Sequence, residues 1–264
     1  MKAEALFDVR GRVALVTGAA SGLGLAMAEV MAENGAHVAL ADKNEAALAR
    51  ETARLKAAGG AVEPVVVDVA DLAALNAAVA SVAARHGRLD VAFANAGISA
   101  GPSFMTAEGA IEAVQPAKWS EVLQVNLTSV FETMRAASIP MKRQKSGRIV
   151  VTASVAGLKA ERMVGYAYAA TKAAVINIVR IAALELAPFN VMVNAIAPGP
   201  FLTNIAGGRL HRQPEIARQF ERIVPLGRMA DPKELKGLAL LLASPASSFI
   251  TGTVIPIDGG ISAG

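Results

Sequence analysis

The stretch Thr17-Gly-Ala-Ala-Ser-Gly-Leu-Gly24 decides the fold expected of this chain. It follows the apolar run Val13-Ala-Leu-Val-Thr17, which is typical of a buried parallel strand, and it opens a helical stretch over residues 24–34. Glycine lets the backbone turn tightly and approach a ligand closely, and a helix N-terminus offers free N–H groups. This order of elements predicts a site for the pyrophosphate of a dinucleotide. The residues expected to form it are Gly18, Ser21, Gly22, Leu23 and Gly24.

Strand-like and helix-like segments alternate through the rest of the chain. Apolar runs predict strands at residues 13–17, 37–41, 62–67, 90–95, 147–154, 191–197 and 253–257. Helical patterns cover residues 24–34, 44–58, 71–86, 119–142, 165–186 and 231–243, with Asn44 and Asp71 as expected caps. Repeated strand–helix–strand units imply parallel pairing with helices on both faces. We therefore expect residues 1–264 to form one α/β domain of the Rossmann type, a doubly wound parallel sheet of about seven strands.

Two longer connections, residues 98–117 and 199–225, are expected to have functional roles. Loops of this length in a compact domain usually carry function, and ligands of open parallel sheets bind beyond the carboxyl ends of the strands. We expect residues 199–225, the lid, to cover the substrate. Met163, Val164, Phe201 and Leu202 suggest some apolar lining of the substrate pocket. An excess of basic residues in the lid would suit an anionic substrate or form a solvated helix face; these residues are Arg209, His211, Arg212, Arg218 and Arg222.

Composition argues against several other classes of protein. Hydrophobic residues make up 53% of the chain, and the net charge of +4 comes from scattered Lys and Arg with only 4% aromatic residues, so we expect no nucleic-acid partner. Without cysteine, and with His37, His86 and His211 away from carboxylates at ligand spacing, we expect no metal. No uninterrupted apolar stretch reaches the roughly 18 residues of a membrane span, and the first residues lack a signal-peptide pattern. We therefore expect a cytoplasmic protein without a membrane partner.

Asp42 lies at the end of the second predicted strand and bears on the choice of dinucleotide. A carboxylate at this position can accept hydrogen bonds from both hydroxyls of the adenosine ribose, and it would repel a 2′-phosphate. Its neighbour Lys43 could instead meet such a phosphate. We expect NAD as the cofactor, with NADP as the less favoured alternative.

Tyr168 and Lys172 are four residues apart on a predicted helix, a spacing that places both side chains on one face. A nearby ammonium favours the phenolate, so we expect Lys172 to lower the pKa of Tyr168. Such a tyrosine can protonate a carbonyl or deprotonate an alcohol. Tyr166 is six residues from Lys172 and off this face, so we interpret it as a pocket or packing residue.

The chain resembles the short-chain dehydrogenases/reductases, and the resemblance covers nearly its whole length. Its motifs, in chain order, are Thr17-Gly-x-x-x-Gly-x-Gly24, Asn95-Ala-Gly97, Asn126, Ser154, Tyr168-x-x-x-Lys172, Pro198-Gly199 and Asp258-Gly-Gly260. The resemblance implies that Tyr168 is the general acid/base and that Lys172 lowers its pKa and binds the nicotinamide ribose. It also implies that Ser154 orients the substrate oxygen and that Asn126 kinks a helix and holds a water leading from Lys172 to solvent.

The same resemblance assigns residues around the cofactor. Asp68 and Val69 match the adenine-contacting pair, and Thr203 matches the position that holds the nicotinamide carboxamide. The other matched positions lie beside the cofactor: Asn95, Ala96, Gly97, Pro198 and Gly199.

Several of these assignments have alternatives. Thr152 competes with Ser154, Asn126 could be an ordinary helix residue, and Thr203 could cap a lid helix. The 14 positions from Ser154 to Tyr168 are one more than the family spacing, which would bulge the intervening loop.

The function expected is NAD-dependent interconversion of a secondary alcohol and a ketone by hydride transfer, with Tyr168 as general acid/base. The alternatives are reduction of a 3-oxoacyl thioester with NADPH and a non-catalytic dinucleotide-sensing protein, although the latter should have a broken Ser/Tyr/Lys set. The resemblance also implies a homotetramer formed through helices at about 119–142 and 165–187. The second helix is heavily apolar at Ala173, Val175, Ile176, Ile178 and Val179.

Overall fold

The sheet is built around β1 (Val13–Thr17), the strand that precedes the glycine turn. In the computed structural model, which describes residues 2–203, 205 and 214–263, seven strands form one sheet in the order β3-β2-β1-β4-β5-β6-β7. Every neighbouring pair is parallel. The other strands are β2 (His37–Asp42), β3 (Ala61–Val66), β4 (Val91–Ala94), β5 (Gly147–Thr152), β6 (Val191–Pro198) and β7 (Val254–Ile257).

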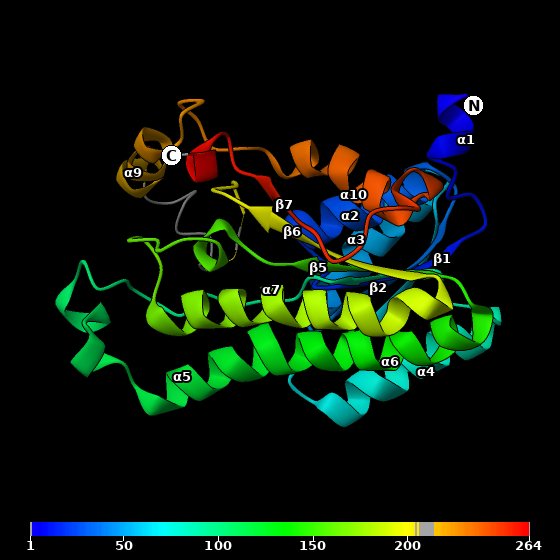
Figure 1. Cartoon of the computed structure of the whole chain (residues 1–264), viewed down its shortest axis with the longest axis horizontal. Helices are drawn as coiled ribbons and strands as arrows, with labels where there is room; N and C mark the ends of the chain where they lie inside the picture. The colour runs from blue at the N-terminus through cyan, green and yellow to red at the C-terminus, as the bar shows by residue number, and fades with distance from the viewer. Residues whose placement is uncertain (1, 204, 206–213, 264) are drawn as a thin grey trace.

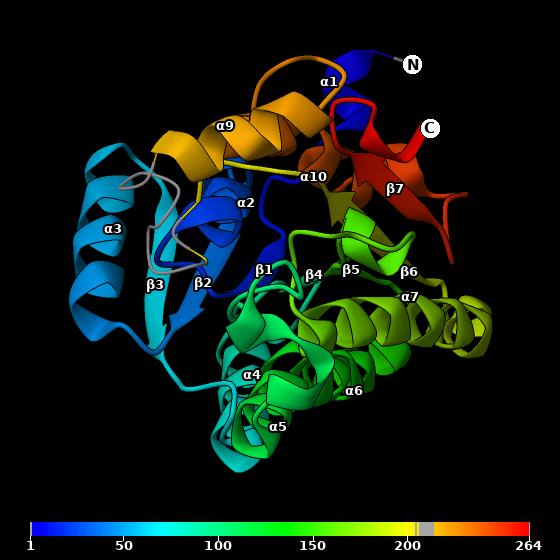
Figure 2. The ribbon, with the colours of Figure 1, turned by 90° about the vertical axis from the view of Figure 1, so that its left-hand side faces the viewer.

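Helices cover both faces of this sheet (Figure 1; Figure 2). The helices that the structure describes, some of which lie off the sheet, are α1 (Ala3–Leu6), α2 (Gly22–Glu33), α3 (Glu45–Ala57), α4 (Leu72–His86), α5 (Pro116–Leu123), α6 (Ser129–Gln144), α7 (Tyr166–Leu186), α9 (Pro214–Ile223) and α10 (Lys236–Ala243). Successive residues of β1 point to opposite faces: Leu15 joins the core under α4, α6 and α7, and Val16 joins the core under α2, α3 and α10. The predicted doubly wound α/β sheet is confirmed.

Two predicted helices differ from expectation. The helix expected over residues 119–142 is divided into α5, the π-helical turn Gln124–Thr128, and α6. The helix expected over residues 231–243 begins as a 3-10 turn, Pro232–Leu235, before α10. Its start is fixed by a capping box, in which Asp231 accepts from the main chain and Glu234 binds back to the Asp231 N–H.

The expected caps of α3 and α4 are confirmed. The Asn44 side chain accepts a hydrogen bond from Ala47 N at 3.1 Å, and the Asp71 side chain accepts one from Ala74 N at 3.0 Å. Each cap satisfies one of the N–H groups that the first helical turn leaves free. Both helices therefore start directly after a strand-end loop.

The two long connections are partly ordered. Residues 98–117 contain short 3-10 turns and give way to α5 at Pro116, so this loop is shorter than expected. Within the lid, α9 lies at the left of Figure 1, the side toward which β6 and β7 point. Three of the basic lid residues, Arg209, His211 and Arg212, lie outside the described residues.

Helix α7 is apolar on more than one side. With the turn after it, it is long and apolar enough to cross a membrane by length and composition. Val175 and Val179 pack in the protein core, which accounts for part of this character. Ile181 and Leu184 are 60% and 80% exposed, so the surplus apolar surface lies near the C-terminal end of α7. Three residues expected to suggest self-association are buried within the protomer: Val175, Ile176 and Val179.

Candidate active site

A cavity of about 700 Å³ opens at the carboxyl ends of the strands, and its size is typical of ligand pockets. The glycine turn, the ends of several strands, the start of α7 and the lid contribute to its walls. The predicted site residues that line it are Gly18, Ser21, Gly22, Leu23, Asp42, Asp68, Val69, Asn95, Ala96, Gly97, Ser154, Tyr168, Lys172, Pro198, Gly199 and Thr203. Gly24 and Asn126 were also predicted to belong to the site, but they lie behind its lining.

The glycine turn has the conformation that its sequence predicts. Gly18 and Gly22 have φ values of +69° and +57°, which side chains rarely tolerate. Gly24 has a different role: a Cβ there would lie 2.1 Å from Gly18 O, because α2 packs directly on the turn. The N-cap Ser21 makes no side-chain capping bond, so the first N–H groups of α2 are left for a ligand at the cavity.

The carboxylate of Asp42 is held against the glycine turn. Its Oδ2 accepts from Ala20 N at 3.0 Å and its Oδ1 from Asn44 N at 2.9 Å. Lys43 turns away from Asp42 and binds Asp68, with Nζ 3.3 Å from Oδ2. The Asp42 carboxylate therefore lies at the end of β2, and the Lys43 ammonium lies at Asp68, after the end of β3.

Asn95 joins three strands beside the cavity. Its Nδ2 donates to Thr17 O at 3.0 Å, and its Oδ1 accepts from the Thr152 hydroxyl at 2.9 Å. These bonds hold β1, β4 and β5 together at their carboxyl ends. The Thr152 hydroxyl donates to Asn95, whereas the Ser154 side chain is hydrogen-bonded to Tyr168, so the geometry favours Ser154 over Thr152 for contact with a substrate.

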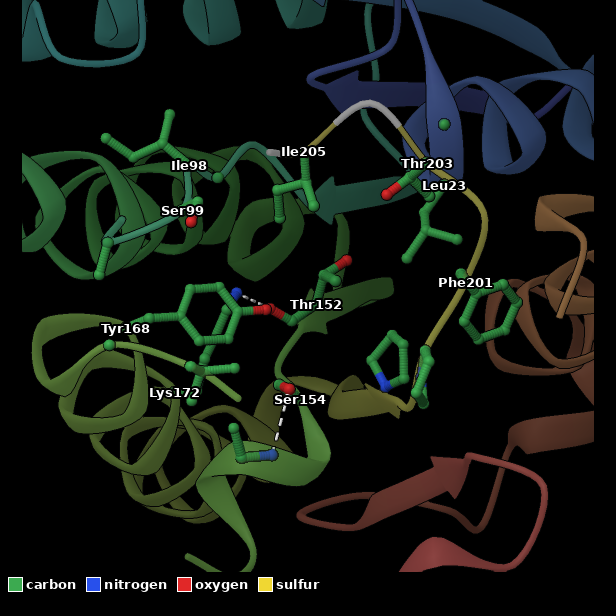
Figure 3. A pocket seen from close by; sticks show the side chains of 18 of the residues that line it. Leu23, Ile98, Ser99, Thr152, Ser154, Tyr168, Lys172, Phe201, Thr203 and Ile205 are labelled. Atoms are coloured by element: carbon green, nitrogen blue, oxygen red, sulfur yellow. Dashed lines mark hydrogen bonds between the residues drawn. The ribbon is translucent and has the colours of Figure 1, made fainter. Parts of the chain in front are cut away.

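Tyr168 and Lys172 come from the first turns of α7 and point toward the end of β5, where Thr152 and Ser154 lie (Figure 3). Lys172 Nζ donates to Thr152 O at 2.6 Å and lies 5.6 Å from the centroid of the Tyr168 ring. Strand β5 ends at Thr152, not at residue 154 as expected, and a 3-10 turn begins after Ser154. The longer spacing between Ser154 and Tyr168 leaves the two side chains hydrogen-bonded.

The net shift of the Tyr168 pKa is upward, opposite to the expected lowering. Burial raises the pKa of Tyr168, and its hydrogen bond with Ser154 only partly opposes this effect. Burial also lowers the pKa of Lys172, to about 8. Both shifts have one cause, since removing a group from water disfavours its charged form, and spacing along a helix does not report burial.

Asn126 is a positioning residue. It is fully buried in the π-helical turn, where its Oδ1 accepts from Ile98 N and its Nδ2 donates to Ile98 O, both at 2.8 Å. The helix kink implied by the family resemblance falls where the structure has this π-helical turn. Asn126 thereby fixes the loop that follows Gly97, and its predicted contact with a water stays a prediction.

Tyr166 packs on Phe104, with ring centroids 6.5 Å apart, and does not line the cavity. Of the four apolar residues expected near the substrate, Met163, Val164 and Phe201 line the cavity, whereas Leu202 lies outside it.

Sequence reasoning missed further lining residues. They come from the 98–106 loop, from the loop before α7, from α9 and from the C-terminal segment: Ser99, Ser103, Met105, Thr106, Glu161, Gln219, Phe220, Ile223, Met229 and Ile261. The spacing of Gln219, Phe220 and Ile223 on one helical face was a usable signal for α9. The sequence singled out the connection over residues 98–117 as a whole, but no signal identified which of the other side chains line the cavity, because irregular loops bring them together. Among the described residues, no group of three or more His, Asp or Glu could hold a metal ion.

Comparison with known proteins agrees with this geometry. The sequence model of the family described as enoyl-(acyl carrier protein) reductase matches residues 18–262. Cyclohexanol dehydrogenase of Rhodococcus sp. (strain TK6) is 38% identical over 96% of this chain and 97% of its own length. The chain belongs to the short-chain dehydrogenase/reductase family, and it is an oxidoreductase.

Solved structures show the same fold with two cofactors. A gluconate 5-dehydrogenase from Burkholderia cenocepacia, in complex with NADP and tartrate, has a TM-score of 0.90 at 32% identity, over 100% of both chains. A 3-oxoacyl-(acyl-carrier protein) reductase from Brucella melitensis with bound NAD has a TM-score of 0.85 at 35% identity, over 99% of this chain and 96% of that one. The cofactor of such a site is thus NAD or NADP.

Proposed function

We propose that the protein is an NAD-dependent oxidoreductase that interconverts a secondary alcohol and a ketone. The observation that carries the proposal is the convergence of Ser154, Tyr168 and Lys172 in a cavity that also contains the glycine turn. When bound, the nicotinamide ring accepts or donates the hydride. The dehydrogenase named for cyclohexanol, a secondary alcohol, supports the same reaction class.

The chain's own residues would move the proton. During oxidation the Tyr168 oxygen takes the proton of the substrate hydroxyl, and during reduction it returns a proton to the carbonyl oxygen. The Ser154 hydroxyl binds the same substrate oxygen and orients it. The Lys172 ammonium, held at Thr152 O, stabilises the phenolate that oxidation requires.

Binding of the cofactor would follow the shape of the cavity. The N-terminus of α2 would take the pyrophosphate, and Asp68 and Val69 would contact the adenine. Thr203 would hold the carboxamide, beside the nicotinamide-lining Pro198 and Gly199. All of these residues line one continuous cavity, which supports this orientation.

NAD is preferred over NADP on electrostatic grounds. The Asp42 carboxylate, fixed by two main-chain N–H groups, would accept the ribose hydroxyls and repel a 2′-phosphate. Lys43 is paired with Asp68, so its charge is partly neutralised and less able to attract the 2′-phosphate of NADP.

The direct test measures a panel of alcohols and ketones with NAD(H) and NADP(H) through the absorbance of reduced nicotinamide. We expect turnover of secondary alcohols with NAD, loss of turnover in Tyr168→Phe, and retained cofactor binding in that variant. Tyr166→Phe is the matched control and should keep its activity. Substantial turnover in Tyr168→Phe would refute the assignment.

Reduction of a 3-oxoacyl thioester is the second candidate, supported by the structural likeness to the Brucella melitensis reductase. Faster turnover of an acetoacetyl thioester with NADPH than of any alcohol with NAD would favour it. The intact Ser154, Tyr168 and Lys172 arrangement argues against a non-catalytic sensor.

We also propose a homotetramer that associates through α6 and α7. These helices expose large apolar side chains, namely Phe131, Ile139, Ile181 and Leu184, at 50%, 49%, 60% and 80% exposure. Size-exclusion chromatography with light scattering should give a mass above that of one chain, and Leu184→Glu should lower it. A monomeric wild-type protein would contradict this proposal.

A further inference from the structure

The structure assigns a charge preference to the substrate half of the cavity: we propose that the substrate is an uncharged secondary alcohol or ketone with an apolar body, and that Glu161 disfavours anionic substrates. This inference rests on the proposed function and deepens it. Family membership leaves the point open, because the relatives described above are named for cyclohexanol, which is neutral, and for gluconate, which is an anion.

The part of the lid that the structure describes presents a largely apolar face to the cavity. On α9, Phe220 and Ile223 line the cavity together with the uncharged Gln219. Arg218 and Arg222 lie outside this lining and are exposed. Ile205 of the lid also points into the cavity (Figure 3). The two basic residues described on α9 are therefore not placed to receive an anion, whereas Arg209, His211 and Arg212 lie outside the described residues.

The 98–106 loop, which also lines the cavity, contributes hydroxyl groups but no charged side chain. Ser99 Oγ accepts from Gly101 N at 3.2 Å, and Ser103 Oγ accepts from Met105 N at 3.3 Å. The Thr106 hydroxyl donates to Ser103 O at 3.4 Å. The Ser99 and Ser103 hydroxyls keep a proton that a neutral substrate oxygen can accept, and Met105 adds an apolar and adaptable surface beside them.

The loop before α7 adds Met163 and Val164 to the apolar lining, together with one carboxylate. Glu161 lies between Ser154 and Tyr168 in sequence, lines the cavity, and is half-buried. Its Oε1 accepts from Met163 N at 3.2 Å, which fixes the carboxylate against this loop. The other described acidic lining residues, Asp42 and Asp68, lie at the ends of β2 and β3.

The charges of this half of the cavity therefore oppose an anion. Lys172 is the cation among its described lining residues, and its Nζ is bound to Thr152 O beneath Tyr168. A substrate carboxylate would meet the Glu161 carboxylate and apolar walls in a space partly shielded from water, where like charges repel more strongly than in solution. A neutral ring or chain would instead remove these walls from water.

The test compares three alcohols that share one ring: cyclohexanol, trans-4-hydroxycyclohexanecarboxylate and the methyl ester of that acid. The ester removes the charge of the acid and is larger by only one methyl group. In the wild-type protein with NAD, we expect kcat/KM for the ester to exceed that for the acid by about tenfold or more, with the difference in KM. Glu161→Gln should shift the acid-to-ester ratio toward the acid by about tenfold. The matched control is Glu112→Gln, an exposed carboxylate outside the lining, which should leave the ratio unchanged.

Binding gives a second readout that does not depend on turnover. Saturation-transfer NMR on the NAD-loaded protein should detect cyclohexanone and the methyl ester of 4-oxocyclohexanecarboxylic acid more strongly than the free acid. Charge-selective binding without turnover of any alcohol would overturn the proposed function and support the inference. Turnover or binding of the acid equal to the ester, an unchanged ratio in Glu161→Gln, or binding of none of the ring compounds would overturn the inference.

Discussion

The Lys172 ammonium donates to the main-chain oxygen of Thr152 across 2.6 Å, which ties the catalytic helix α7 to the end of β5. The same threonine donates its hydroxyl to Asn95, so its two polar groups serve two different neighbours. Tyr168, one helical turn before Lys172, is thereby held at a fixed distance from the strand ends. The chemistry expected of this arrangement leads to the following predictions.

Alcohol oxidation should become faster as pH rises. Oxidation needs the Tyr168 phenolate, and burial raises the pKa of Tyr168, so the reactive fraction grows as pH increases through the alkaline range. Ketone reduction needs the protonated phenol and should decline only above that range. Profiles of kcat/KM against pH in both directions measure this. An oxidation rate that falls across the same range would contradict the role of Tyr168.

Replacing Lys172 should change the rate and its pH dependence together. Lys172→Met removes the cation beside the phenol, so oxidation should fall by about 100-fold and its rise should move to higher pH. Lys172→Arg keeps the positive charge, so the rise of its oxidation rate should lie at a lower pH than in Lys172→Met. Because burial lowers the pKa of Lys172 to about 8, the difference between wild type and Lys172→Met should be largest below that pH, where the ammonium is charged. A lower oxidation rate in Lys172→Met with an unchanged midpoint of the pH profile would indicate a purely structural role for Lys172. The control is Lys56→Met, which replaces an exposed lysine on α3.

Cofactor preference should depend on Asp42. Asp42→Ala removes the carboxylate that faces the ribose, so the ratio of kcat/KM with NADP to that with NAD should rise by about tenfold or more. Asp8→Ala removes a surface carboxylate paired with Arg10 and should leave the ratio unchanged. Equal ratios in wild type and Asp42→Ala would show that another group selects the cofactor.

Two glycines in helices should respond in opposite ways to alanine. At Gly24 a Cβ would lie 2.1 Å from Gly18 O, so Gly24→Ala should lower the free energy of unfolding by about 1–3 kcal/mol and weaken cofactor binding. At Gly237, in α10, a Cβ would meet nothing within 4 Å, so Gly237→Ala should stabilise the protein by about 0.5–1 kcal/mol. Urea titrations of both variants measure the difference, and similar effects would contradict the packing of α2 on the turn.

Asn126→Ala should reduce stability and activity together. The substitution leaves the Ile98 N–H and C=O without their partner in a buried place, at a cost of about 1–3 kcal/mol for each unpaired group. Asn126→Asp keeps the oxygen that accepts from the Ile98 N–H, so its stability and activity should lie between those of wild type and Asn126→Ala. Asn177→Ala, at an exposed position of α7, is the control. Full activity in Asn126→Ala would show that the loop after Gly97 needs no such support.

Local signals in the sequence predict those parts of the fold that short-range chemistry determines. The glycine turn, the apolar strands and the caps Asn44 and Asp71 each depend on neighbours within a few residues. Tyr168 and Lys172 share a face because of helical periodicity alone. These features were therefore predicted correctly from residue type and spacing.

The remaining features depend on contacts between distant segments. In the π-helical turn, the Asn126 side chain binds the main chain of Ile98, 28 residues away. The direction of the Tyr168 pKa shift depends on burial, and the place of Glu161 depends on the path of an irregular loop. Neither periodicity nor capping patterns contain this information.

The π-helical turn also has a consequence for the outer surface of the protein. It adds one residue to a helical turn, and one residue corresponds to a rotation of about 100° around a helix axis. The phase of α6 relative to α5 is therefore set at Asn126. With this phase, Val130 and Met134 face the core while Phe131 and Ile139 face outward. Deleting that one residue would turn a different stripe of α6 to the outside. The helical register at Asn126 therefore determines both the support of the active-site loop and which side chains of α6 face outward.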